Sequence, residues 1–242
     1  MSKSVTPYAN SNKRKKEQIA GMFNNIAGKY DFLNHFLSLN IDKIWRKKVV
    51  NILKSYNPKI ILDVATGTGD LAIATLKINP KKIYGIDISD GMLNIGQKKI
   101  KQKGHDSIIS LKKGDAENIP FDDNTFDAVT VAFGVRNFED LDTGLSEIYR
   151  VLKPNGICVI LEFTTPEFFP MKQLYGFYFK YILTTFGKFI SKDNSAYDYL
   201  PKSVEAFSQR EEFTNKLKKC YFNDTKFINL TFGVATIYTG IK

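Results

Sequence analysis

Between residues 60 and 163, short apolar runs alternate with longer amphipathic segments. The apolar runs are typical of strands buried on both faces of a sheet, and they predict strands at 60–65, 82–87, 107–112, 126–132 and 157–163. The segments between them carry apolar residues at helical spacing and predict helices at 69–79, 90–103 and 140–152. Because most of the strands are separated by helices, right-handed crossovers would join them into a mostly parallel sheet.

The two ends of the chain add further elements to this alternating core. The predicted additions are helices at 13–27, 30–39, 41–55 and 203–220, an aromatic helical region at 167–190, and strands at 222–230 and 234–241. The last two strands are expected to form an antiparallel hairpin. The fold class is therefore α/β: a Rossmann-like, doubly wound sheet with N-terminal helices and a C-terminal hairpin. We expect one domain over 13–242, with a helical cap at 13–57 and a flexible tail at 1–12.

The composition fits a globular protein with one such core. Of the 242 residues, 43% are hydrophobic and 25% charged, and no long uncharged apolar run predicts a transmembrane helix. The lysine-rich N-terminus lacks the apolar segment of a secretory signal, and two cysteines, Cys158 and Cys220, fit a reducing compartment. We expect a cytoplasmic protein, and no cluster of residues has metal-ligand spacing.

The net charge of +10 is concentrated near the N-terminus. Residues 1–50 hold ten Lys or Arg against three Asp or Glu. Such a surface attracts nucleic acid or an anionic membrane. A lysine-biased composition with solvated faces explains the same excess without any partner.

The segment from Ile60 to Asp70 is a buried-strand pattern that runs into a glycine turn, Gly67-Thr68-Gly69, and then into a helix. Glycines let a backbone approach a ligand closely. Asp87 ends the next predicted strand, 18 residues after Gly69, where a carboxylate can accept both hydroxyls of a ribose. The turn alone is equally compatible with a strand-to-helix connection that binds nothing, and Asp87 is what favours a nucleoside site.

The residues around this turn favour S-adenosylmethionine over a dinucleotide. Asp63 and Asp70 place negative charge on both sides of the turn, which suits a cationic ligand better than a pyrophosphate. The third strand leads to Asp115 and Ala116. There the Asp115 carboxylate can accept from the adenine amino group, and the Ala116 amide can bind the ring.

Three motifs resemble one family of class I methyltransferases, the quinone-biosynthesis C-methyltransferases that act on demethylmenaquinol or polyprenyl benzoquinol. They are Tyr30-Asp-Phe-Leu-Asn34 with Leu37-Ser38 and Trp45, Phe133-Gly-Val-Arg-Asn137, and Arg150 to Thr164. The chain departs from the usual residues at Leu33, Asp42, Ala132, Asn155 and Thr164, where relatives carry Met, His, Ser, Gly and Ser.

The resemblance implies C-methylation of demethylmenaquinol to menaquinol with S-adenosylmethionine, and the C-terminal segments favour this over the alternative benzoquinol of ubiquinone biosynthesis. The implied partner is a prenylated quinol, and a homo-oligomer stays open. Asp42 leaves any role of the family's usual His unassigned.

The acceptor is expected near Phe133–Asn137, because ligands of open α/β sheets bind at the carboxyl ends of the strands. A phenol ionises near pH ~10, so Arg136 is the catalytic candidate, either as a charge that favours the phenolate or through a water that takes the proton. The alternative is a structural arginine paired with an acid such as Asp140. Tyr30, Asp31 and Asn34 are expected either to cover the pocket from the N-terminal helices or to serve only helix packing and capping, and Tyr199 and Ser203 are secondary candidates for the cover.

The aromatic segment 168–190 is interrupted by Lys172, Lys180 and Lys188. It is expected either to be a core helix or to be an apolar wall for a polyprenyl tail, with its lysines toward lipid headgroups at the inner face of the membrane.

Two other functions compete with the quinone methyltransferase. A nucleic-acid methyltransferase would explain the basic charge. The chain lacks an Asn-Pro-Pro-Tyr site after the fourth strand, and neither cysteine follows a proline as a base-attacking nucleophile would. We therefore expect no nucleic-acid partner. A cofactor-binding scaffold without catalysis is the second alternative, and the intact set from Asp63 to Asp115 argues against it.

Overall fold

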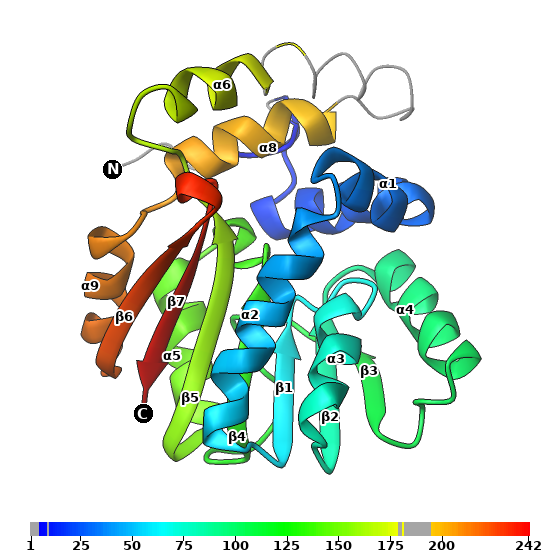
Figure 1. Cartoon of the computed structure of the whole chain (residues 1–242). Helices are drawn as coiled ribbons and strands as arrows, with labels where there is room; N and C mark the ends of the chain where they lie inside the picture. Colours follow the sequence, from blue (N-terminus) through cyan, green and yellow to red (C-terminus); the bar gives the residue numbers. More distant parts are fainter. Residues whose placement is uncertain (1–4, 9, 179–180, 182–194) are drawn as a thin grey trace.

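The structure is a computed structural model that describes residues 5–8, 10–178, 181 and 195–242 (Figure 1). Its centre is a seven-stranded sheet in the order β3-β2-β1-β4-β5-β7-β6. The strands are β1 Ile60–Val64, β2 Lys82–Asp87, β3 Ile109–Lys113, β4 Phe126–Ala132, β5 Leu152–Phe163, β6 Asn223–Leu230 and β7 Ala235–Ile241. The first five pair in parallel, while β7 pairs antiparallel with both β5 and β6. The predicted fold class, with its C-terminal hairpin, is confirmed.

Helices cover both faces of this sheet, as Figure 1 shows. They are α1 Lys15–Leu37, α2 Ile41–Tyr56, α3 Asp70–Thr75, α4 Asp90–Gln102, α5 Leu141–Val151, α6 Met171–Phe177, α8 Ser195–Ala206 and α9 Glu211–Lys219. The short 3-10 turns are η1 Leu76–Ile78, η2 Val135–Asn137 and η4 Thr231–Gly233. In the part of the chain that the structure describes, no helix is long and apolar enough to cross a bilayer.

Neighbouring residues of β1 contact two different cores. Ile61 packs in the core formed with α2, α3 and α4, whereas Leu62 packs in the core formed with α5 and α9. Both side chains are fully buried. The residues of β2, β4 and β5 divide between the two cores in the same way, which is why these strands read as largely apolar runs, whereas the buried residues of β3 contact only the first core. Helix α2 also belongs to the first core.

The N-terminal helices differ from the prediction. A break was expected near Gly28, but α1 runs through it as one helix. Packing against α4 outweighs the weak helix propensity of glycine. The Asn24 side-chain oxygen of α1 accepts a hydrogen bond from the Gly91 N–H at 2.8 Å and another from Ser89 Oγ at 2.8 Å. These bonds tie α1 across the start of α4, above the carboxyl ends of the strands (Figure 1).

The C-terminal half departs from the prediction in two places. The helix expected at 203–220 is divided into α8 and α9, because Arg210 adopts a positive φ of 52° and donates its N–H to Tyr238 Oη at 2.8 Å. Strand β5 begins at Leu152, five residues before the predicted start at Ile157, and crosses an irregularity in its pairing with β4. Of the aromatic region 167–190, residues 179–180 and 182–190 lie outside the described residues.

Candidate active site

The glycine turn lies at the carboxyl end of β1, and its two glycines do different things. Gly67 has φ +55°, a Cβ placed there would meet open space, and its N–H donates to Asp87 Oδ2 at 2.8 Å. Gly69 has φ +80°, but its Cβ would contact the side chains of Ile100 and Leu111. Only Gly67 therefore borders free space for a ligand, and Gly69 serves the packing of the turn on α4 and β3.

Asp63 is buried next to this turn and is held by two hydroxyls. Thr66 Oγ1 donates to its Oδ2 at 2.6 Å, and Thr130 Oγ1 of β4 donates to its Oδ1 at 2.7 Å. Burial raises the pKa of Asp63 to about 6, although both hydrogen bonds oppose the rise. Asp63 thus ties β1 to β4. Because its pKa is raised toward neutral pH, a nearby cation would favour its charged form.

Asp87 ends β2 and holds the turn from the other side. Its Oδ1 accepts the Ser89 N–H at 2.8 Å, and its Oδ2 accepts the Gly67 N–H. Burial raises the pKa of Asp87, while these backbone bonds lower it. A cavity of about 70 Å³, the Asp87 cavity, is lined by Asp87 with Gly67, Asp115 and Ala116.

The far side of the Asp87 cavity is closed by α1. Lys16 Nζ lies 2.9 Å from Asp115 Oδ2, and the Glu117 N–H donates to Asp115 Oδ1 at 2.9 Å. Ala116 is buried beside them. Four of the predicted cofactor residues, Gly67, Asp87, Asp115 and Ala116, therefore line one cavity.

A second small space of about 30 Å³, the Asp63 cavity, lies on the other side of Gly67. Asp63, Gly67, Thr68 and Arg46 contribute to its lining. Thr68 is buried, and its Oγ1 donates to Asp31 Oδ1 of α1 at 2.5 Å. Asp31 thus anchors α1 on the turn. It is not part of the lining of the Asp87 cavity, the Asp63 cavity or the large cavity described next.

Acidic and basic side chains from α1, α2, α3 and α4 form an ion-pair network beside the Asp63 cavity. Asp42 Oδ2 accepts from Arg46 Nη1 and lies 2.8 Å from His35 Nδ1. Asp70 is bound by Lys99 at 2.8 Å. The oxygens and imidazole of His35, Asp42 and Asp70 lie close enough to hold a metal ion. Because Arg46 and Lys99 already neutralise both acids, this group is an ion-pair network of the protein.

The third space, the large cavity, has a volume of about 470 Å³ and lies under α6 and α8, next to α1 and α2. Its lining is dominated by aromatic and aliphatic side chains, including Phe23, Trp45, Phe133, Phe163, Leu174 and Tyr178. Tyr30 and Phe133 line all three cavities. The apolar large cavity therefore adjoins the polar glycine turn at the rings of Tyr30 and Phe133.

Arg136 lies in the wall of the large cavity and pairs with a residue that sequence reasoning missed. Its Nη1 is 2.6 Å from Oε1 of Glu162, a fully buried residue of β5. Burial raises the pKa of Glu162, and the Arg136 charge opposes that rise. The expected alternative partner, Asp140, instead caps α5 through the Asp142 and Thr143 N–H groups. A polar residue inside the apolar run Cys158–Phe163 was the available signal for Glu162.

Among the expected cover residues, Tyr30 and Asn34 line the large cavity. Tyr199 also lines it and donates from its hydroxyl to Asn137 Oδ1 at 3.1 Å. Ser203 supports the wall, because its hydroxyl accepts from Arg136 Nε at 3.3 Å.

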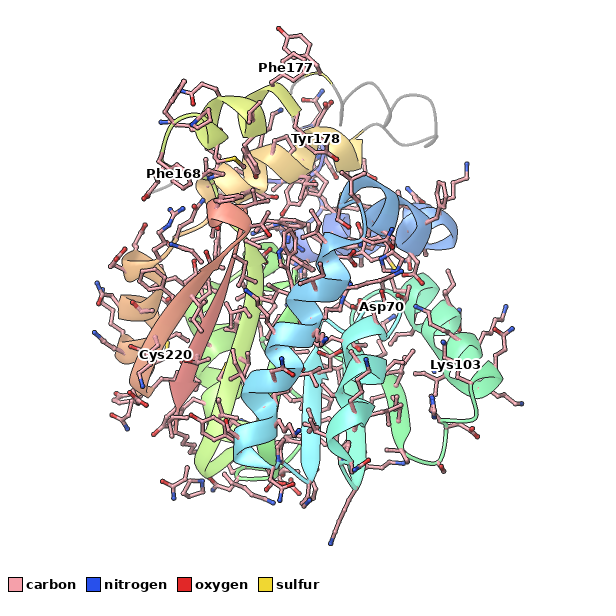
Figure 2. All side chains as sticks on the ribbon, in the orientation of Figure 1. Asp70, Lys103, Phe168, Phe177, Tyr178 and Cys220 are labelled. Carbon is pink, nitrogen blue, oxygen red and sulfur yellow. The ribbon has the colours of Figure 1, made fainter. Side chains whose placement is uncertain are left out.

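The described part of the aromatic segment is largely outside the core. Phe169 is 79% exposed, and Figure 2 shows the Phe177 ring projecting away from the rest of the molecule. Tyr175 and Tyr178 of the same segment line the large cavity. The expectation of a core helix is therefore wrong for this part, and α6 forms the outer wall of the cavity.

A family model matches residues 11–242, almost the whole chain, and its description is the ubiE/COQ5 methyltransferase family. The chain belongs to this family. The resemblance read from the motifs around Tyr30, Phe133 and Arg150 is therefore confirmed.

Several family members are similar to the chain over nearly their full lengths. A protein of Bacteroides fragilis named demethylmenaquinone methyltransferase is 53% identical, with 98% of this chain and 97% of the relative covered. One of the same name from Porphyromonas gingivalis is 43% identical, with 98% of each covered. A ubiquinone/menaquinone biosynthesis C-methyltransferase UbiE of Geobacter sulfurreducens is 45% identical, with 94% and 90% covered.

Solved structures agree on the fold. A putative S-adenosylmethionine-dependent methyltransferase of Methanococcus maripaludis superposes with a TM-score of 0.65 at 22% identity, covering 97% of each chain. A further S-adenosylmethionine-dependent methyltransferase, from Thermotoga maritima, gives 0.64 at 20% identity, covering 92% of this chain and 99% of that one. At these identities the likeness supports the architecture alone.

Proposed function

We propose that this protein methylates a ring carbon of demethylmenaquinol to give menaquinol, with S-adenosylmethionine as methyl donor. The observation that carries the proposal is the large apolar cavity joined to the glycine turn at Tyr30 and Phe133. A flat aromatic ring with an apolar tail fits this lining, and the names of the most similar relatives select the naphthoquinol. A polyprenyl benzoquinol is the alternative, because a relative named UbiE is 45% identical over 94% of this chain.

The residues present fit the cofactor. The open space where a Gly67 Cβ would lie is what a ligand passing the turn requires. We assign Asp87 to the ribose hydroxyls and Asp115 and Ala116 to the adenine. Thr68, Gly67 and Asp63 lie beside the methionine part of the cofactor, the methionine arm, in this assignment. When bound, the cofactor supplies an electrophilic methyl group on a sulfonium. Gly69 acts indirectly, by packing the turn.

The protein's own contribution is to place the acceptor and to favour its ionised form. In-line displacement gains from positioning, which can contribute ~7–11 kcal/mol. Arg136 lies in the cavity wall with its guanidinium held by Glu162, Phe133 O and Ser203. From this fixed position its charge lowers the pKa of a bound phenol, and the ionised quinol ring carbon becomes nucleophilic.

The cavity disfavours a nucleic-acid substrate. Aromatic and aliphatic side chains dominate its described lining, and its two arginines, Arg46 and Arg136, do not form an extended row of positive charges for a phosphate backbone. We also propose that 13–242 acts as one catalytic domain, since α1 and α2 both contribute to the cavities.

A lipid analysis of cells that lack this protein tests the reaction. Loss of the methylated menaquinone with accumulation of its demethyl precursor is the expected result. Accumulation of a demethylated benzoquinone would select the alternative acceptor. An unchanged quinone profile would contradict both.

Asp87→Ala is expected to weaken binding of S-adenosylhomocysteine without unfolding the protein. The ribose loses two hydrogen bonds to a charged acceptor, each contributing ~1.5–3 kcal/mol. The Gly67 and Ser89 N–H groups also lose their acceptor, which loosens the turn. Isothermal titration calorimetry measures the loss, with Asp127→Ala, at the opposite end of the sheet, as the control. A dissociation constant equal to that of wild type would remove Asp87 from the site.

We propose that the enzyme contacts the membrane through the rim of the large cavity and meets a prenylated acceptor there. The rim consists of five apolar side chains, Phe168, Phe169, Leu174, Phe177 and Phe232, all about half or more exposed. Leu174 and Phe177 also line the cavity, so an apolar tail could pass from bilayer to site. Exposed Lys172 would add attraction to anionic headgroups.

The double variant Phe168→Ala/Phe169→Ala is expected to bind anionic liposomes on the order of tenfold more weakly, because each inserted ring contributes apolar burial. Tyr221→Ala/Ile228→Ala removes similarly exposed side chains from the turn after α9 and from β6, and it is the matched control. Sedimentation at low and high salt separates this apolar part from the electrostatic part. Equal binding by the two double variants would place the contact elsewhere.

A further inference from the structure

Arg46 has one donor that the structure leaves unused. Its side chain is 10% exposed, and its Nε–H is buried without a hydrogen-bond partner. The two terminal nitrogens face Asp42 and Asp70, the latter at 3.6 Å. A buried guanidinium N–H is costly to leave unpaired, so this position favours an acceptor supplied by a ligand.

Arg46 also belongs to the lining of the Asp63 cavity. Among the described residues that line it, Arg46 is the one basic side chain, facing Asp63 and Asp70. Lys99 is engaged by Asp31, Asp70 and the Thr68 hydroxyl. Asp63, whose carboxylate is held by two hydroxyls, would attract an ammonium, whereas Arg46 adds a place for a carboxylate beside it.

A free amino-acid group carries this pair of charges. With the ribose on Asp87, the methionine arm passes Gly67, which lines both the Asp87 cavity and the Asp63 cavity. We propose that Arg46 binds the α-carboxylate of this arm with its guanidinium, while Asp63 favours the ammonium; this rests on the proposed function. Helix α2 then takes part in cofactor binding.

Asp42 acts as a positioning residue in this arrangement. It accepts from Arg46 Nη1 and also from Ser38 Oγ at 2.7 Å, so it fixes the guanidinium from the side away from the ligand. This gives a role to the residue that stands where the family usually carries a histidine. Arg46 also borders the large cavity, so the test must separate a carboxylate contact from an acceptor contact.

The test compares the affinity of the protein for S-adenosylmethionine and for its decarboxylated form, which keeps both the sulfonium and the ammonium. Wild type is expected to prefer the carboxylated ligand by about tenfold to a hundredfold, the range of a hydrogen bond to a charged group. Because only the ligand changes, this comparison does not depend on any variant folding. Equal affinities in wild type would overturn the inference.

Arg46→Met is expected to reduce the preference to within about threefold. The double variant Arg46→Met/Asp42→Asn removes the uncompensated Asp42 charge and is expected to give the same ratio in a more stable protein. Arg210→Met is the matched control, since Arg210 is also 10% exposed, pairs with Glu167 and lines none of the three cavities. A full preference retained in folded Arg46→Met would assign the carboxylate to another donor.

Methylthioadenosine, which lacks the amino-acid arm, separates this inference from the proposed function. Its affinity is expected to be equal in wild type and Arg46→Met. If wild type binds none of the three ligands, the cofactor assignment itself fails. If methylthioadenosine binding falls as much as that of S-adenosylmethionine, Arg46 shapes the turn and the carboxylate contact is refuted.

Discussion

Gly67→Val is expected to abolish cofactor binding more completely than any other substitution in the turn. The residue has φ +55°, where a β-branched side chain is strained, and its Cβ would enter the open space between the Asp87 and Asp63 cavities. The valine side chain would thus occupy the path of the ligand. We expect the dissociation constant of S-adenosylhomocysteine to rise by about a hundredfold or more, equivalent to at least ~2.7 kcal/mol.

A second glycine separates strain from blocked space. Gly104 has φ +68° and open surroundings, but it follows α4, away from the cavities. Gly104→Val therefore carries the same kind of backbone strain and is expected to lower the melting temperature while leaving affinity unchanged. Calorimetric titration and thermal unfolding of both variants decide between the two effects. Normal affinity in Gly67→Val would mean that no ligand passes this turn.

The parts of the fold and site that the sequence predicted are those coded by local pattern. Ile61, Leu62 and Val64 of β1 are apolar because the strand faces two cores, and this recurs in β2, β4 and β5. Asp87 and Asp115 were found because strand ends in a parallel sheet converge at one edge. An apolar run and the end of a strand can both be recognised from residues that are neighbours in the sequence.

What the sequence did not predict depends on contacts between distant segments. Gly28 reads as a break, yet α1 continues because Asn24 bonds to α4. The alternative reading of Arg136 paired it with an acid such as Asp140, but its partner Glu162 is 26 residues away on the adjoining strand. Arg46 carries no motif of its own and became a candidate only when its burial and its unused donor were known.

Arg136→Gln is expected to lower turnover by ~10²–10³-fold, the usual effect of removing one electrostatic contribution to a transition state. The amide keeps some hydrogen-bonding capacity but removes the charge that favours the phenolate. Affinity for S-adenosylhomocysteine should stay within about threefold, less than ~1 kcal/mol, because Arg136 lines the large cavity and neither small one. Single-turnover rates with a soluble demethylmenaquinol analogue, alongside calorimetry, measure both quantities.

Because Arg136 pairs with Glu162, a second variant is needed to separate a loss of turnover from a loss of stability. Arg136→Gln leaves a fully buried Glu162 without its counter-charge, and breaking such a pair costs ~3–5 kcal/mol of stability. Arg136→Gln/Glu162→Gln removes both charges and should recover much of the melting temperature. If Arg136 acts on the acceptor, turnover stays low in the stable double variant. If turnover returns with stability, Arg136 only neutralises Glu162, and the phenolate is favoured by another group.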